Sequence, residues 1–177
     1  MSGVVGLSHV LTDRLDLRAM TSDDTDSLHQ ILCDGRNRRY IPGGPKESRE
    51  ESRAWVERFS GRWAASGLGY WTVRLRATGA VIGAGGAERR PKFWNLYYLI
   101  DWRHWGCGYG TELALAAQRA AAAVAPHVPV AGWIHEENAA SQAVARHLGL
   151  TDYGPRETAH WNGDPIHYWA DRPPAPG

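Results

Sequence analysis

The chain has 177 residues, of which 43% are apolar, and its formal net charge is +1. A chain of this size can bury one sizeable core, so we expect a single domain over residues 1–177, with its core at 12–170 and flexible ends at 1–11 and 171–177. The near-zero charge argues against nucleic acid or an anionic membrane as a partner. No apolar run in the sequence approaches the roughly 18 residues that cross a bilayer.

The two cysteines, Cys33 and Cys107, lie far apart in the sequence and suggest neither a metal site nor a disulfide framework. A reducing, cytoplasmic location fits this usage best. The first ten residues lack the basic segment of a secretory signal. Arginine outnumbers lysine and alanine runs are frequent, which indicates a bacterial source.

The first part of the chain predicts one strand followed by two helices. Residues 15–20 alternate between apolar and polar side chains, as a half-buried strand does. Thr21 can cap a helix that reaches about Cys33. Ser48 and Glu51 have the spacing of a capping box, which opens the second helix.

The rest of the chain predicts a run of closely spaced strands and then an alternation of helices and strands. The further strands are expected at residues 70–76, 80–88, 94–100, 128–134, 150–157 and 165–170. The further helices are expected at residues 109–124 and 138–148. The last two strands flank Asn162-Gly163, which is typical of a tight hairpin. This order predicts an α+β fold with a mixed sheet of about seven strands, an antiparallel meander followed by a parallel pair, flanked by about four helices.

The segment Tyr97–Glu112 carries the strongest functional signal, because an aromatic strand leads through a glycine-rich turn into a helix. Its three glycines stand at alternate positions: Gly106, Gly108 and Gly110. Backbone amides at such a helix start suit a phosphate or pyrophosphate. The spacing and the three preceding antiparallel strands disfavour a dinucleotide fold, and a P-loop would need a Lys-Ser/Thr pair after the glycines.

The same segment resembles a known family. Arg103-x-x-Gly106-x-Gly108 resembles the Q/R-x-x-G-x-G/A signature of the GNAT N-acetyltransferases. Residues 105–112 resemble the W-G-x-G-Y-A-T-E stretch of the Rim-type branch, which acetylates N-termini of ribosomal proteins. Residues 138–150 resemble the N-x-A-S…L-G-F stretch of that branch. The resemblance covers about residues 12–170 and implies a GNAT fold.

The resemblance implies acetyl-coenzyme A as co-substrate, with its pyrophosphate on the amides of the turn and its pantetheine arm in a gap beside the third meander strand. That strand is expected to carry a bulge that opens the gap. The implied cofactor-binding residues are Leu99, Ile100, Arg103, Trp105, Gly106, Cys107, Gly108, Tyr109, Gly110, Thr111, Asn138 and Ser141. For the glycines, the alternative is that they only permit a tight turn. Asn138 can also serve simply as a helix cap.

Two residues are candidates for catalysis. Ser141 is either an ordinary residue of the first helical turn or, by the resemblance, a hydroxyl that supports the departing thiolate. Glu88 is the preferred general base, acting through water, because the ammonium of an amine acceptor must lose a proton before or during attack. His135 and Glu136 are the other candidates for that base; each of the three is otherwise an ordinary solvated side chain.

These features together predict an N-acetyltransferase that acts by direct attack of a primary amine on the thioester. The acceptor is either a protein N-terminus or a small-molecule amine, and some of the nine tryptophans are expected to wall its cleft. No metal is expected, and the chain is expected to be a monomer or a homodimer. The alternative is a GNAT domain that senses acyl-coenzyme A without turnover.

Overall fold

The computed structural model describes residues 6–156 and 165–174, which form one sheet of eight strands in the order β1-β2-β3-β4-β5-β6-β8-β7. The strands are β1 (His9–Leu11), β2 (Leu15–Ala19), β3 (Tyr70–Leu75), β4 (Val81–Arg89), β5 (Trp94–Ile100), β6 (Val130–His135), β7 (Thr151–Pro155) and β8 (Ile166–Ala170). Strands β5 and β6 run parallel, and the other neighbours run antiparallel. The predicted mixed sheet, with a meander followed by a parallel pair, is confirmed.

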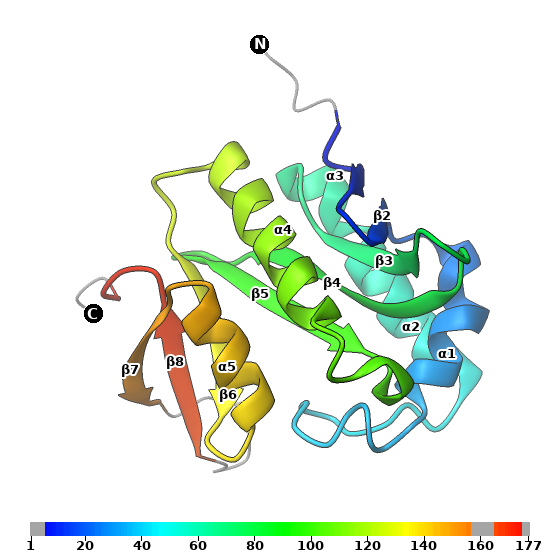
Figure 1. The fold of residues 1–177 in the computed structure, drawn as a ribbon. Coiled ribbons are helices and arrows are strands. Elements are labelled where there is room, and N and C mark those ends of the chain that lie inside the picture. Colours follow the sequence, from blue (N-terminus) through cyan, green and yellow to red (C-terminus); the bar gives the residue numbers. More distant parts are fainter. Residues whose placement is uncertain (1–5, 157–164, 175–177) are drawn as a thin grey trace.

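Helices cover both faces of the sheet. They are α1 (Thr25–Leu32), α2 (Arg49–Ser60), α3 (Arg62–Ser66), α4 (Tyr109–Val124) and α5 (Ala139–His147), with short 3-10 turns η1 (Ser22–Asp24) and η2 (Trp102–His104). Figure 1 shows α4 and α5 in front of the sheet and α1 and α2 behind it. Among the described helices, none combines the length and apolarity that a bilayer span needs.

Strand β1 is an addition to the predicted sheet, since residues 9–11 were expected in a flexible end. It pairs antiparallel with β2, and Val10 lies opposite Leu17. The indole Nε1 of Trp71 also donates to the carbonyl oxygen of Leu7 at 2.7 Å. The sequence pattern missed β1 because three residues are too few to show an alternation.

The two faces of the sheet bury separate cores. On the front face, Leu113, Ala117 and Ala121 of α4 are buried at helical spacing against the central strands. Gly85 on β4 allows this close approach, because a Cβ there would lie 2.4 Å from the carbonyl oxygen of Tyr97 and 2.8 Å from Cδ2 of Leu113. On the back face, α1 and α2 bury a second cluster against β3, β4 and β5.

Two predicted helix starts are confirmed. Ser48 Oγ accepts from the backbone N–H of Glu51 at 3.1 Å, and Glu51 accepts in return from the N–H of Ser48, which completes the capping box of α2. Asn138 Oδ1 accepts from the N–H of Ser141 at 3.1 Å and caps α5. Such caps each stabilise a helix by about 1 kcal/mol. The second cap also fixes where Ser141 stands.

The parallel strands β5 and β6 separate after a short contact. They pair only at Trp94 with Val130 and at Asn95 with Ala131, so the rest of β5 diverges from β6. The predicted gap is therefore present, but the predicted bulge is not. The register between β4 and β5 runs unbroken from Gly83 opposite Ile100 to Arg89 opposite Trp94. The strands part by diverging in direction, without an extra residue in β5. The predicted Asn162-Gly163 hairpin lies outside the described residues.

Candidate active site

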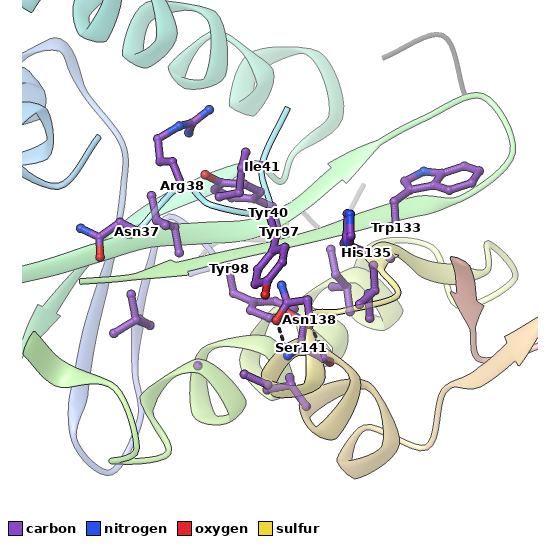
Figure 2. A pocket seen from close by; sticks show the side chains of 18 of the residues that line it. Asn37, Arg38, Tyr40, Ile41, Tyr97, Tyr98, Trp133, His135, Asn138 and Ser141 are labelled. Carbon is purple, nitrogen blue, oxygen red and sulfur yellow. Dashed lines mark hydrogen bonds between the residues drawn. The ribbon is translucent and has the colours of Figure 1, made fainter. Parts of the chain in front are cut away.

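The gap between β5 and β6 opens into a cavity of about 1390 Å³. Its α4 side is lined by residues 104–106, 108–111, 132–135, 137–141, 143–144 and 147. Its α2 side is lined by residues 36–43, Lys46, three residues of α2 (Trp55, Arg58 and Phe59), Tyr70, Arg90, Pro91 and Phe93. Residues 95–100 of β5 lie between the two sides. Figure 2 shows the loop after α1, with Arg38 and Ile41, across the cavity from Asn138 and Ser141.

The glycines of the loop before α4 have different roles. Gly106 and Gly108 have φ of +74° and +79°, which L side chains rarely adopt, so the turn itself requires them. Gly110 has no such φ, and a Cβ there would meet only Cγ1 of Ile100, at 4.0 Å. The turn therefore does not explain Gly110, whose missing side chain leaves room at the cavity wall.

The start of α4 directs backbone amides toward this loop. Glu112 N–H donates to the carbonyl oxygen of Gly108 at 3.1 Å and closes the first helical bond, so the amides that precede it are left for other acceptors. The helix dipole adds partial positive charge at the same point. An open position at Gly110 and a free helix start fit a phosphate or pyrophosphate group.

Arg14, from the turn between β1 and β2, holds this loop in place. Its Nη1 donates to the carbonyl oxygen of Cys107 at 2.7 Å, and its Nε donates to Glu112 Oε2 at 2.7 Å. The guanidinium also lies 4.6 Å from the centroid of the Tyr109 ring. Burial tends to raise the pKa of Glu112, but the hydrogen bonds from Thr12 and Arg14 outweigh it and hold this pKa below its usual value. Sequence reasoning missed Arg14, which no motif near the glycines signals.

The start of α5 is tied to β5 by a second contact. The hydroxyl of Tyr98 donates to the carbonyl oxygen of Ser141 at 3.2 Å, and burial raises the pKa of Tyr98 to about 12. Together with the Asn138 cap, this bond fixes the backbone of Ser141. Within the described part of the chain, the Ser141 hydroxyl itself makes no hydrogen bond. Its oxygen is available to a ligand in the cavity.

The α2 side of the cavity is walled by stacked aromatic rings. Tyr70 stacks on Tyr97 with ring centroids 4.9 Å apart, and Phe59 stacks on Tyr70 at 4.5 Å. Trp55 tilts against Tyr97 at 6.0 Å. All four residues line the cavity, so Trp55 is one of the tryptophans on its wall. Trp161 lies outside the described residues.

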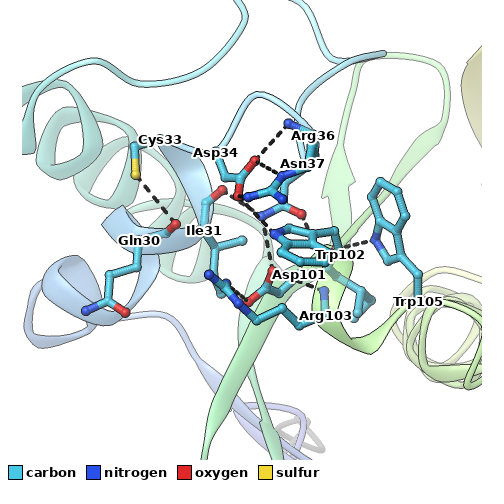
Figure 3. A network of polar contacts seen from close by, with 11 residues as sticks. Gln30, Ile31, Cys33, Asp34, Arg36, Asn37, Asp101, Trp102, Arg103 and Trp105 are labelled. Atoms are coloured by element: carbon cyan, nitrogen blue, oxygen red, sulfur yellow. Dashed lines mark hydrogen bonds and ion pairs between the residues drawn. The ribbon is translucent and has the colours of Figure 1, made fainter.

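A polar network connects the loop after α1 to the root of the glycine-rich loop (Figure 3). Asn37 is 6% exposed; its Oδ1 accepts from the backbone N–H of Trp102 at 2.6 Å, and its Nδ2 donates to Asp101 at 3.4 Å. Trp102 Nε1 donates to Asp34 at 2.9 Å, and the Arg36 guanidinium holds the pKa of Asp34 well below its usual range. The two loops on opposite sides of the cavity are thus fastened to each other.

Residues 14–151 match the family model described as an acetyltransferase (GNAT) domain. The chain belongs to the GNAT acetyltransferase family. It is 27% identical over 145 residues to the uncharacterized protein YkkB of Bacillus subtilis, covering 80% of this chain and 84% of that one. The family accounts for the mixed sheet, the splayed strands and the glycine-rich loop.

Solved GNAT structures share the fold. An acetyltransferase from Agrobacterium tumefaciens has a TM-score of 0.78 at 23% identity, with 95% of this chain and 96% of that chain covered. RimL, described as a ribosomal L7/L12 alpha-N-protein acetyltransferase, has a TM-score of 0.77 at 21% identity, with 91% and 95% covered, and its structure contains coenzyme A. The predicted likeness to the Rim-type branch therefore extends to the fold.

Most of the predicted cofactor-binding residues of this GNAT chain lie on the cavity wall. They are Leu99, Ile100, Trp105, Gly106, Gly108, Tyr109, Gly110, Thr111, Asn138 and Ser141. Arg103 and Cys107 are not on the wall. Arg103 Nη1 pairs with Asp101 Oδ2 at 2.9 Å, and the Cys107 thiol is exposed and points to the carbonyl oxygen of Trp105 at 3.6 Å. Contact of any of these residues with a coenzyme stays a prediction.

Glu88, the preferred base, lies one layer behind the wall. It is 1% exposed, and its carboxylate is ion-paired with Arg62 Nε at 3.0 Å and with Arg90 Nη2 at 2.9 Å. The angles of these pairs fall short of well-aligned hydrogen bonds, so the contacts are mainly electrostatic. Arg90 itself lines the cavity, and it separates Glu88 from the space where an amine could bind. The role of Glu88 as base stays a prediction.

The other two candidate bases differ in position. His135 lines the cavity, and its Nδ1 accepts from the backbone N–H of Glu137 at 3.1 Å. A neutral ring with Nδ1 as acceptor carries its proton on Nε2, so His135 offers the cavity a donor and no free base nitrogen. Glu136 is exposed and does not line the cavity. Among the residues described by the structure, no group of three or more His, Cys, Asp or Glu is placed to hold a metal ion.

Proposed function

We propose that this GNAT chain transfers an acetyl group from acetyl-coenzyme A to a primary amine by direct attack of the amine nitrogen on the thioester carbonyl. The observation that supports this most is the course of the cavity. It extends from the amides at the start of α4, through the gap between β5 and β6, to the aromatic wall of the α2 side. A donor and an acceptor can therefore meet in one continuous cavity.

The α4 side is the proposed place of the coenzyme. The amides of residues 106–111 would hold the pyrophosphate, because the N–H of Trp105 already donates to the carbonyl oxygen of Trp102 at 3.2 Å, and Cys107 would contribute through its backbone alone. Leu99 and Ile100 lie on the part of β5 that does not pair with β6. The Leu99 carbonyl oxygen faces Gly83 of β4 and the Ile100 carbonyl oxygen accepts from Trp105 Nε1 at 2.7 Å, so the Ile100 N–H is the backbone group that would meet the pantetheine arm. Asn138 and Ser141 would meet that arm from α5, with the Ser141 hydroxyl near the sulfur to stabilise the departing thiolate.

The acceptor amine has to be neutral when it attacks. Glu88 remains the proposed base, and its position behind Arg90 requires a water molecule to relay the proton. The wall itself assists, because several arginines and a lysine line the α2 side. Nearby positive charges disfavour an ammonium and lower the pKa of a bound amine. The same charges argue against polyamines as acceptors.

The acceptor class is proposed from the relatives and from the chemistry of the site. RimL is described as acting on the α-amine of a ribosomal protein, so a protein N-terminus is one candidate. A small-molecule amine is the other. We further propose that the chain acts as a single cytoplasmic domain, as a monomer or a homodimer, with neither nucleic acid nor membrane as partner.

Two measurements test this proposal. Acetyl-coenzyme A at micromolar concentration is expected to raise the melting temperature, because a ligand that binds only the folded state stabilises it. A thiol-release assay across a panel of amines is expected to show turnover with at least one of them. An unchanged melting temperature would overturn the cofactor assignment. Binding with silence on every amine would favour the sensor.

A further inference from the structure

Positive charge is distributed unevenly around the cavity. Every lysine and arginine on its wall comes from the α2 side: Arg36, Arg38, Arg39, Lys46, Arg58 and Arg90. Among the residues that the structure describes, the α4 side contributes none of these residue types to the wall, and Glu137 supplies a carboxylate there. Arg36 is paired with Asp34 and Arg90 with Glu88. In the described ranges, the other four cations have no carboxylate within ion-pair distance.

Arg38 is the most deeply buried of these cations, at 3% exposed. Its Nε donates to the carbonyl oxygen of Gly44, and its Nη2 donates to that of Pro42 at 3.2 Å, so one edge of the guanidinium holds the loop. Nη1 is buried and makes no well-aligned hydrogen bond, and no carboxylate pairs with it, among residues 6–156 and 165–174. A buried guanidinium without a counter-charge is strongly unfavourable unless an anion pairs with it.

Tyr97 supplies a second donor beside Arg38. Its hydroxyl is buried, and in the described part of the chain no group accepts its proton. Burial raises the pKa of Tyr97 to about 12, although the charge of the adjacent Arg38 and a hydrogen bond from its guanidinium oppose the rise, so the group is a neutral O–H at physiological pH. Figure 2 shows Arg38 and Tyr97 together on one side of the cavity, opposite Ser141. Buried polar groups in native proteins almost always have partners, so a guanidinium without a counter-charge beside a hydroxyl proton without an acceptor, both in a ligand cavity, point to an anionic ligand.

We infer that the acceptor is an anionic amine, whose carboxylate binds between Arg38 Nη1 and the Tyr97 hydroxyl. This inference rests on the proposed amine acetyl transfer. Lys46 and Arg58 add attraction from the same side of the wall, and the aromatic rings accommodate the part of the acceptor between carboxylate and amine. A carboxylate is an acceptor-only group that matches two converging donors. It belongs either to a small amino acid-like molecule or to an acidic residue near a peptide N-terminus.

Binding to the protein saturated with coenzyme A tests the carboxylate site separately from turnover. Two matched pairs serve as probes in isothermal titration calorimetry. One is meta-(aminomethyl)benzoate against its carboxamide, which have similarly basic amines. The other is the tripeptide amide Ser-Asp-Phe-NH2 against Ser-Asn-Phe-NH2. We expect the carboxylate member of at least one pair to bind at least about tenfold more tightly than its partner. The pair that shows the preference identifies the source of the carboxylate.

Three variants test whether Arg38 and Tyr97 cause the tighter binding of the carboxylate probe. Arg38→Met is expected to remove it, and Tyr97→Phe to reduce it several-fold without disturbing the bonds from Arg38 to the loop. Arg53→Met, on α2 but off the cavity wall, makes the same charge change and is expected to leave the preference intact. The acetyl-coenzyme A melting shift checks the folding of each variant, and Tyr97→Phe carries the test if Arg38→Met does not fold.

Equal or weaker binding of both carboxylates by the native chain overturns the inference, as does a preference that survives in Tyr97→Phe and in Arg38→Met. Neither result affects the proposed acetyl transfer, which the thiol-release assay tests. Conversely, if the protein binds carboxylates preferentially but turns over no amine, the anion site is supported and the proposed acetyl transfer is not.

Discussion

The two sides of the cavity present different parts of the chain to a ligand. The α4 side relies on backbone: glycines at Gly106 and Gly108 with positive φ, an open position at Gly110, and the amides at the start of α4. The α2 side presents side chains: its cations come from residues 36–46, α2 and Arg90, and its stacked aromatic rings come from α2, β3 and β5. Backbone recognition suits a group that never changes, such as a pyrophosphate. Side-chain recognition can diverge while the fold stays the same.

The largest expected effect concerns the backbone of the α4 side, which we propose binds the pyrophosphate of the coenzyme. Gly108→Glu places a side chain at φ of +79° and a carboxylate beside the helix start, so we expect it to abolish the melting shift caused by acetyl-coenzyme A. Gly35→Glu, at an exposed glycine with open space around it, is the control and is expected to retain the shift. Measurable binding by Gly108→Glu would contradict the proposed place of the pyrophosphate.

Ser141 is the proposed exception on the α4 side, because its role depends on a side chain. We expect Ser141→Ala to lower kcat by about tenfold to hundredfold, since the departing thiolate loses a hydrogen-bond donor. The melting temperature and the affinity for acetyl-coenzyme A should be unchanged, because the backbone bonds of Ser141 remain. Steady-state kinetics measures this, with Ser60→Ala on α2 as the control. An unaltered kcat would leave Ser141 a structural residue.

On the α2 side, Glu88→Gln separates catalysis from stability. We expect the variant to lower the free energy of unfolding by about 1–3 kcal/mol, because Arg62 and Arg90 lose a buried partner. A role as base requires in addition a fall in kcat of about hundredfold. Urea unfolding and kinetics on the same preparation distinguish the two roles. A destabilised variant with full kcat would remove Glu88 from the mechanism.

Gly110→Ala distinguishes a ligand cradle from a turn. Alanine favours a helix over glycine, so the variant is expected to raise the free energy of unfolding by up to about 1 kcal/mol. Its methyl group enters the open space at the wall, so acetyl-coenzyme A is expected to bind several-fold more weakly. Gly35→Ala again serves as the control. If stability and affinity both rise, the space at Gly110 is unused.

The smallest expected effect concerns Glu112, which together with Arg14 anchors the glycine-rich loop before α4. The pKa of Glu112 is held below its ordinary value, so the ionised carboxylate stabilises the fold at any pH above that ordinary value, and this contribution is lost as the pH falls through the lowered folded-state pKa. Glu112→Gln is therefore expected to lower the melting temperature at about pH 7 and to matter much less at about pH 3. An equal loss at both values would show that the ionised form is not what anchors the loop.

The sequence predicts the backbone features of the α4 side better than the side-chain contacts that form between distant segments. Gly106, Gly108 and the Asn138 cap could be predicted because local backbone geometry restricts the residues allowed there. Arg14 could not, because its bonds to Cys107 and Glu112 form only when distant segments pack together. Arg38 and Tyr97 were missed for the same reason. A bulge expected from the family was wrong, since strand direction alone opens the gap.

The divergence of β5 from β6 leaves two strand edges inside the molecule that do not bond to each other beyond Asn95 and Ala131. Unpaired strand edges invite pairing with other chains, and proteins usually cover them. An extended ligand arm lying in this gap would cover both edges at once. Supply of the coenzyme in the cell would then also govern how much of the protein stays free of aggregates, so expression in cells depleted of coenzyme A should yield less soluble protein.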